Sequence, residues 1–74
     1  MTASRYLKMT GFQTEVRRYE SEAQAEIALA EAIELHRNRG FVVKRDADGK
    51  HLTIHPDGKA AQIWIENEAG VVVS

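Results

Sequence analysis

The sequence has no cysteine and a single proline among its 74 residues. Without cysteine there is no disulfide bond, no thiolate metal ligand and no cysteine nucleophile. A chain of this length buries only a modest core, so its stability must come from unusually good packing or from self-association. We therefore expect residues 1–74 to form one small domain.

Long apolar runs are missing as well. No segment approaches the roughly 20 apolar residues that cross a bilayer, and residues 1–19 lack the apolar stretch of a secretory signal. Together with the absence of cysteine, this composition predicts a soluble cytoplasmic protein. The formal net charge of −1 argues against a dedicated nucleic-acid binder, although it leaves room for a local basic patch.

The strongest local signal is a helix from Glu22 to Arg39. Ser21 precedes it as an N-cap, and Gln24 completes an S-x-x-Q capping box. The interior is rich in Ala, Glu, Leu and Ile and contains neither Gly nor Pro, so its helix propensity is high. Gly40 suits the left-handed position that commonly follows a helix.

The two sides of this helix differ in composition. At about 100° per residue, the side opposite the predicted core is acidic and contains Ile27, which is either an isolated exposed apolar residue or part of a contact surface. The other side is dominated by small residues, which let a sheet approach closely. We expect it to be buried, and its members are Ala25, Ala28, Leu29, Ala32, Ile33, Leu35 and His36.

Three strands are predicted after the helix: Phe41–Arg45, His51–His55 and Ala60–Asn67. Glycine-containing turns separate them at residues 46–49 and 56–59, which is typical of an antiparallel meander.

Two alternating segments precede the helix, Arg5–Met9 and Phe12–Tyr19, with Thr10-Gly11 between them. They form either a hairpin, which we favour, or one interrupted strand. The sequence therefore predicts an α+β fold, in which one long helix packs on an antiparallel sheet of three to five strands. The order along the chain is one or two strands, the helix, and three strands.

The register of the last three strands has two interpretations. The turn sequences Asp-Ala-Asp-Gly-Lys and Pro-Asp-Gly-Lys suit three-residue loops that end in a bulge glycine, which would turn Leu52 and Ile54 away from the helix. The burial pattern favours a register in which all the apolar residues face the helix. We favour it, because a slip of one residue exposes a whole apolar row. It places Val43 opposite Leu52, Leu52 opposite Ile63 and Ile54 opposite Ala61.

On the favoured register, Trp64 lies on the solvent-facing side of the sheet, opposite His51. A tryptophan there offers a large amphipathic contact area of the kind enriched at binding hot spots. Alternatively, Trp64 packs over its cross-strand neighbours as a second, minor core. The residues that we predict to bind a protein partner lie on this face, together with one on the helix: Lys44, His51, Thr53, His55, Gln62, Trp64 and Ile27.

Residues suited to metal binding or catalysis are sparse. His51 and His55 are four positions apart on one strand, hence about 13 Å apart at roughly 3.3 Å per residue, which is too far to share an ion within one chain. With no cysteine and no carboxylate cluster, we predict neither a metal nor a cofactor. A pair formed by His51 and Glu66 is the best candidate for acid–base chemistry. Such pairs are common on surfaces, and we predict that the chain is not an enzyme.

Nucleic-acid binding is the main alternative. The segment before the helix and the last turn of the helix each carry two arginines, and the predicted fold brings these segments together. They would form a basic edge suited to phosphate contacts, made of Arg17, Arg18, Arg37 and Arg39.

We interpret the chain as a small interaction module that binds another protein through the face around Trp64 or through an open sheet edge. Small domains without chemistry often act as inhibitors, adaptors or antitoxin-like proteins, some of them encoded by phages and other mobile elements. That comparison rests on size alone. Val71–Val73 is apolar and uncharged, so we expect it to form a short last strand whose edge pairs within a homodimer.

Overall fold

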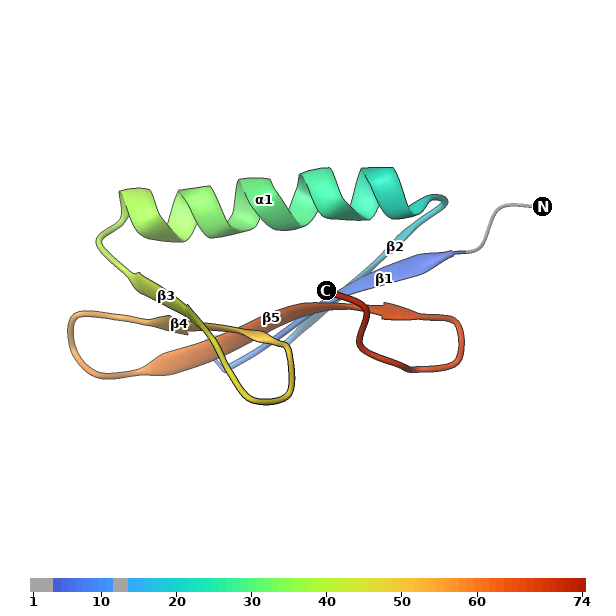
Figure 1. Cartoon of the computed structure of the whole chain (residues 1–74). Coiled ribbons are helices and arrows are strands. Elements are labelled where there is room, and N and C mark those ends of the chain that lie inside the picture. Colours follow the sequence, from blue (N-terminus) through green and yellow to red (C-terminus); the bar gives the residue numbers. More distant parts are fainter. Residues whose placement is uncertain (1–3, 12–13) are drawn as a thin grey trace.

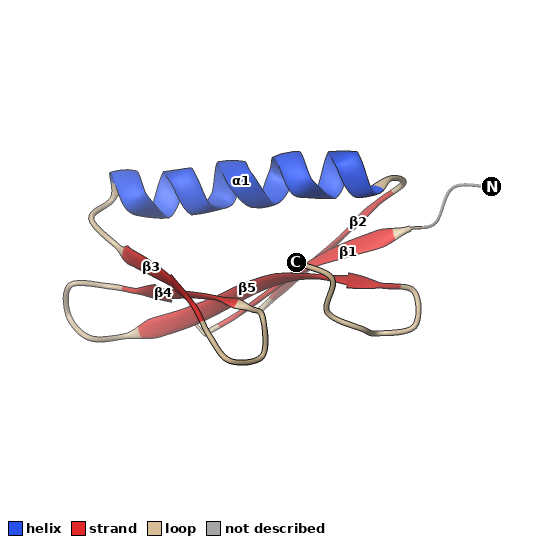
Figure 2. Cartoon of the chain, viewed as in Figure 1, coloured by secondary structure: helices blue, strands red, loops and turns tan. Residues whose placement is uncertain are grey.

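The structure is a computed structural model that describes residues 4–11 and 14–74. A helix packs across one face of a five-stranded antiparallel sheet (Figures 1 and 2), which confirms the predicted α+β fold. The elements are β1 (Arg5–Thr10), β2 (Glu15–Tyr19), α1 (Glu22–Asn38), β3 (Val42–Arg45), β4 (His51–Ile54) and β5 (Ala60–Asn67).

Strand β5 lies at the centre of the sheet. The strand order is β2-β1-β5-β4-β3, and all neighbouring strands are antiparallel. The hairpin of β1 and β2 therefore packs on one side of β5, and the pair of β3 and β4 packs on the other. Within the part of the chain that the structure describes, no helix has the length and apolar character required to cross a membrane.

The predicted N-terminal hairpin is confirmed by the pairing of β1 with β2. Phe12 and Gln13, which the sequence pattern assigns to its second strand, lie outside the described residues. Gly11 has a φ of +114°, and a Cβ on it would lie 2.6 Å from the carbonyl oxygen of Ala60. Glycine is required at this position because the end of β1 packs directly against the start of β5.

Helix α1 begins and ends as its capping signals predict. Ser21 Oγ accepts a hydrogen bond from the backbone N–H of Gln24 at 3.2 Å. At the other end, Gly40 has a φ of +87° and its N–H donates to the carbonyl of Arg37 at 3.0 Å. This left-handed residue satisfies a helix carbonyl and turns the chain back toward the sheet.

The core lies between α1 and the strands β1 and β5. Leu35, which the sequence pattern placed among the buried residues, is instead 49% exposed. It lies at the margin of the buried arc of α1 and lines open space beside β2, so the sheet does not cover it. The residues at the centre of the core are Leu7, Ala25, Leu29, Ile63 and Ile65.

The favoured register of β3, β4 and β5 is wrong by one residue. Leu52 lies opposite Lys44 on one side and Gln62 on the other, and His51 lies opposite Ile63. The predicted pairing of His51 with Trp64 is therefore also wrong. The structure has the register that the turn sequences indicate.

The two turns impose this register through their own hydrogen bonds. In the first, the N–H of Asp46 donates to the carbonyl of Lys50 at 2.9 Å, and the Asp46 carboxylate accepts the N–H groups of Asp48 and Lys50. Gly49 follows with a φ of +83°. The second turn, at residues 55–59, repeats the pattern. Each is a three-residue loop that ends in a bulge glycine.

Because the register differs by one residue from the favoured one, each side chain of β4 lies on the opposite face of the sheet from the one predicted. Successive side chains point to opposite sides of a strand, so Leu52 and Ile54 lie on the face away from α1, whereas His51 and Thr53 lie on the helix side. Thr53 has no exposed surface, and its hydroxyl has no hydrogen-bond partner among the described residues.

The C-terminal segment pairs with β5 of the same chain. Val72 forms a bridge with Glu66, and the N–H of Val73 donates to the carbonyl of Ile65 at 2.8 Å. The predicted last strand is thus reduced to one bridge, and the backbone of these valines is already engaged within the chain.

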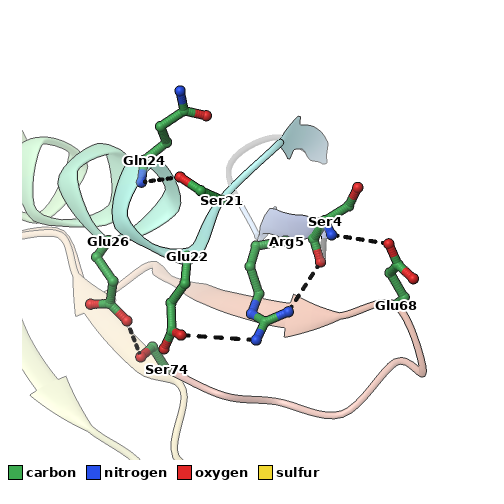
Figure 3. A network of polar contacts seen from close by, with 8 residues as sticks. All are labelled: Ser4, Arg5, Ser21, Glu22, Gln24, Glu26, Glu68 and Ser74. Carbon is green, nitrogen blue, oxygen red and sulfur yellow. Dashed lines mark hydrogen bonds and ion pairs between the residues drawn. The ribbon is translucent and has the colours of Figure 1, made fainter. Parts of the chain in front are cut away.

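A set of polar contacts ties this segment and β1 to the start of α1 (Figure 3). The hydroxyl of Ser74 donates to Glu26 at 2.6 Å, and Arg5 lies 3.9 Å from the Glu22 carboxylate. The N–H of Ser4 donates to Glu68 at 2.9 Å. These contacts hold together parts of the chain that are distant in sequence.

Candidate functional site

The sheet face opposite α1, which we term the outer face, is left open by the fold (Figure 1). Figure 1 shows α1 on one side of the sheet, and no described element packs over the other side. The pairings place the following side chains on it: Tyr6, Lys8, Thr10, Val16, Arg18, Val42, Lys44, Leu52, Ile54, Ala60, Gln62, Trp64 and Glu66.

Trp64 lies on the outer face, as predicted, but it is only 6% exposed. The Nζ of Lys50 lies 4.1 Å from the centroid of its ring. Its Nε1–H donates to Glu66 at 2.6 Å, and Glu66 also pairs with Lys8 at 2.9 Å. Trp64 is therefore the centre of a second, minor core, which is the alternative interpretation of the sequence.

The charged groups beside Trp64 contact one another and the indole. Glu66 accepts hydrogen bonds from Lys8 and from Trp64, and these two contacts lower its pKa below the ordinary value. The ionised carboxylate holds both the ammonium of Lys8 and the indole N–H. This arrangement fixes the orientation of the indole.

An apolar row crosses the outer face beside Trp64. Val42 and Ile54 lie opposite each other on β3 and β4, and Leu52 and Ala60 lie next to them. Val42 is 53% exposed, and Ala60 is also exposed. The sequence pattern had assigned Leu52 and Ile54 to the core. The Asp-Gly turn signals, which place both residues on this face, are the features that identify the row.

Polar residues border this row. The side-chain amide of Gln62 donates to Asp46 at 2.8 Å. Burial raises the pKa of Asp46, but the hydrogen bonds from Gln62 and from the N–H groups of Lys50 and Asp48 outweigh that effect and lower it overall. Lys44 is exposed and makes no ion pair within the described part of the chain. Gln62 and Lys44, both predicted site residues, therefore do lie on the outer face.

Four of the predicted protein-binding residues lie away from the outer face. His51 and Thr53 lie on the helix side, for the reason given above. His55 follows β4 on the same side, where its ring meets Phe41 edge-on at 4.9 Å. Ile27 is on α1, as expected, and is 60% exposed. These residues do not contribute to the outer face.

A groove of about 500 Å³ runs between α1 and the β1–β2 hairpin. Leu7 and Met9 of β1 line its sheet side, and Ala28, Ala32 and Leu35 line its helix side. These five residues are small or apolar, but Glu15, Arg17, Glu31 and Arg39 also line the groove, so its surface is part apolar and part charged.

The structure separates the four arginines of the predicted basic edge. Arg17 and Arg39 line the same groove, but Arg17 is bound to Glu15 at 2.5 Å. Arg18 lies on the outer face, opposite Tyr6. Arg37 lies on the side of α1 near His51, whose pKa it helps to lower.

The candidate acid–base pair is also separated. His51 faces α1, whereas Glu66 lies on the outer face with Lys8 and Trp64. Burial lowers the pKa of His51, and the nearby Arg45 lowers it further. The two side chains are on opposite sides of the sheet, so they cannot act together on one substrate. Among the residues that the structure describes, no group of three or more His, Cys, Asp or Glu side chains is placed to hold a metal ion.

Comparison of the chain with models of protein families, with curated proteins and with solved structures found no match.

Proposed function

We propose that this chain is a non-enzymatic module that binds another protein through its outer face. The observation that carries the proposal is the apolar row of Val42, Leu52 and Ile54, which lies on a sheet face that no described element covers. Contiguous apolar surface bordered by polar residues is typical of protein interaction sites. The roles consistent with such a module are those of an inhibitor, an adaptor or an antitoxin-like protein, and a cysteine-free chain suits the reducing cytoplasm.

Trp64 has a supporting role in this proposal. Because Lys50 and the pair of Lys8 and Glu66 cover it, it stiffens the centre of the face rather than inserting into a partner. The direct contacts come from the neighbouring row. This assignment differs from the prediction that an exposed Trp64 is itself the binding hot spot.

The test uses one substitution on the row and a matched one off it. Val42→Asp adds a charge at a half-exposed valine of the outer face, whereas Val71→Asp makes the same change at a valine of similar exposure. The carbonyl of Val71 accepts a hydrogen bond from the N–H of Asn67, and Asn67 lies on the helix side of the sheet. Tagged chains are used to capture proteins from a lysate of the source organism with and without nuclease treatment, and the captured proteins are quantified by mass spectrometry. We expect the wild type and the Val71 variant to capture a shared partner that the Val42 variant loses.

Circular dichroism and urea unfolding must show that both variants fold. A partner retained by the folded Val42 variant would contradict the proposal. Recovery that disappears when the lysate is treated with nuclease would instead favour nucleic-acid binding. For that alternative, the observation that Arg17 and Arg39 share one groove is the specific support.

Self-association is proposed through the sheet edges. The strands β2 and β3 end the sheet and each has one side without a strand neighbour among the described residues. Since Val71–Val73 is already bonded to β5, a homodimer would use one of these edges rather than the C-terminal segment. Light scattering of the purified chain measures its mass directly, and a monomer at all concentrations would exclude the dimer.

A further inference from the structure

The charged residues of the described surface are segregated by sign. The outer face and the adjacent turn at residues 46–50 carry more basic than acidic side chains. The acidic members are Asp46, Asp48 and Glu66, of which Asp46 and Glu66 are held by internal hydrogen bonds. The basic members are Lys8, Arg18, Lys44 and Lys50.

The exposed side of α1, in contrast, is acidic. The exposed side of α1 carries Glu22, Glu26, Glu31 and Glu34, and Arg37 and the following Arg39 are confined to its C-terminal end. A net charge of −1 therefore conceals an acidic exposed side of α1 and a small excess of basic side chains on the outer face. Such a distribution orients an approaching partner before contact.

Two of the basic side chains are available to a partner. Lys8 is engaged with Glu66, and Lys50 lies over Trp64. Arg18 and Lys44, in contrast, are exposed and make no ion pair within the described residues. They flank the face on opposite sides, since Arg18 is on β2 and Lys44 is on β3.

We infer that the occupant of the outer face is a protein with an acidic surface, which places carboxylates against Arg18 and Lys44 and apolar side chains against the row of Val42 and Ile54. The inference rests on the proposed function and adds the chemistry of the partner. Opposite charges at the rim of an interface speed association and select the correct partner.

Two other occupants fit less well. A second copy of this chain, docked through the same face, would bring Arg18 and Lys44 against a surface that is also basic. Single-stranded nucleic acid requires aromatic faces on which bases stack. Trp64 is 6% exposed and already has Lys50 over its ring, so its indole face is occupied.

The experiment uses paired charge reversals. The test variant carries Arg18→Glu and Lys44→Glu. The control carries Arg37→Glu and Lys59→Glu, which changes the net charge equally at two exposed positions away from the outer face. The protein captured by the wild-type chain is purified, and its Kd for each variant is measured at several NaCl concentrations.

We expect the test variant to bind about tenfold or more weakly at low salt and to lose most of the salt dependence of the wild type. The control should stay within about twofold of the wild type, because charges outside an interface have little effect. An unchanged Kd for the folded test variant would overturn the inference.

The outcomes separate this inference from the proposed function. If Val42→Asp abolishes binding while the charge reversals do not, the outer face binds a partner that is not selected by charge, and only the inference fails. If neither change affects binding, or if the wild type captures no protein, both fail. Binding of a labelled oligothymidylate that is lost in the test variant would identify nucleic acid as the occupant and would also overturn the inference.

Discussion

The ammonium nitrogen of Lys50 lies 4.1 Å from the centroid of the Trp64 ring, on the sheet face away from the helix. Lys50 ends the turn after β3, and the register of that turn determines that it lies beside Trp64. The cation shields the indole from water, while Glu66 accepts its N–H. A polar residue thus covers a large aromatic side chain on a face that would otherwise expose it.

Removing this cover should expose the indole. We expect Lys50→Ala to shift the tryptophan fluorescence to longer wavelength, to increase its quenching by acrylamide, and to lower the free energy of unfolding by about 0.5–1 kcal/mol, the usual size of a cation–π contact at an exposed site. Trp64 is the single tryptophan, so the signal is unambiguous. Lys59→Ala is the control, and equal spectra for both variants would contradict the arrangement.

Thr53 provides a test of the register. Its hydroxyl is buried without a hydrogen-bond partner among the described residues. Because an unsatisfied buried polar group costs roughly 1–3 kcal/mol, Thr53→Val should stabilise the protein by about 1 kcal/mol. In the alternative register Thr53 would face solvent, and the same change would have little effect. The midpoint of urea unfolding distinguishes the two results.

Two glycines with left-handed backbone differ in their surroundings. A Cβ at Gly11 would lie 2.6 Å from Ala60 O, whereas at Gly49 it would meet nothing within 4 Å. We expect Gly49→Ala to cost about 1–2 kcal/mol, from backbone strain alone. Gly11→Ala should cost clearly more, since the hairpin must also move away from β5. Equal losses in urea unfolding would show that the hairpin does not pack as closely as described.

Stability should fall on mild acidification because of two histidines, His36, which is buried, and His51, which is half-buried. Burial lowers the pKa of His36 below its ordinary 6.5, and Arg39 lowers it further. Burial also lowers the pKa of His51, followed by the effect of Arg45, although Glu26 and Asp46 act in the opposite direction. The unfolded chain then binds more protons than the folded one as the pH falls below 6.5. Stability is therefore fully present above that pH and is lost progressively below it, down to the lowered pKa values.

His36→Leu is the variant that tests this effect. It removes one of the titrating groups together with its unpartnered Nδ1. We expect the loss of unfolding free energy between about pH 7 and pH 5 to be smaller than in the wild type. The pKa values of Asp46, Asp57 and Glu66 are lowered from 3.8, 3.8 and 4.5, so their contribution is lost at more acidic pH and does not interfere. An unchanged pH slope would rule out His36 as a contributor.

The features that the sequence predicted correctly depend on local signals. The capping residues Ser21 and Gly40 define the helix, and the bounds of β5 follow from its flanking turns. The fold class follows from these elements. Each of these signals lies within or next to the element that it defines, so the sequence alone indicates which helices and strands form.

The register could not be obtained from burial because both sheet faces are partly buried. Ile63, Trp64 and Ile65 are consecutive and all buried, so alternation gives no preference between the faces. The cover over Trp64 comes from Lys50 and from the pair of Lys8 and Glu66, and the pairing of Lys8 with Trp64 joins strands far apart in sequence. The hydrogen bonds of the turns, which are local, were the better guide. Placing Leu52 and Ile54 in the candidate site depended on them.

The central position of β5 has a consequence for how the protein is made. The hairpin of β1 and β2 and the pair of β3 and β4 have no direct strand contact with each other, and each reaches the sheet only through β5. During synthesis a nascent chain that ends before residue 60 therefore contains a helix and two separate β-pairs, but no continuous sheet to bury the apolar side of α1. Its folding must wait until β5 has left the ribosome.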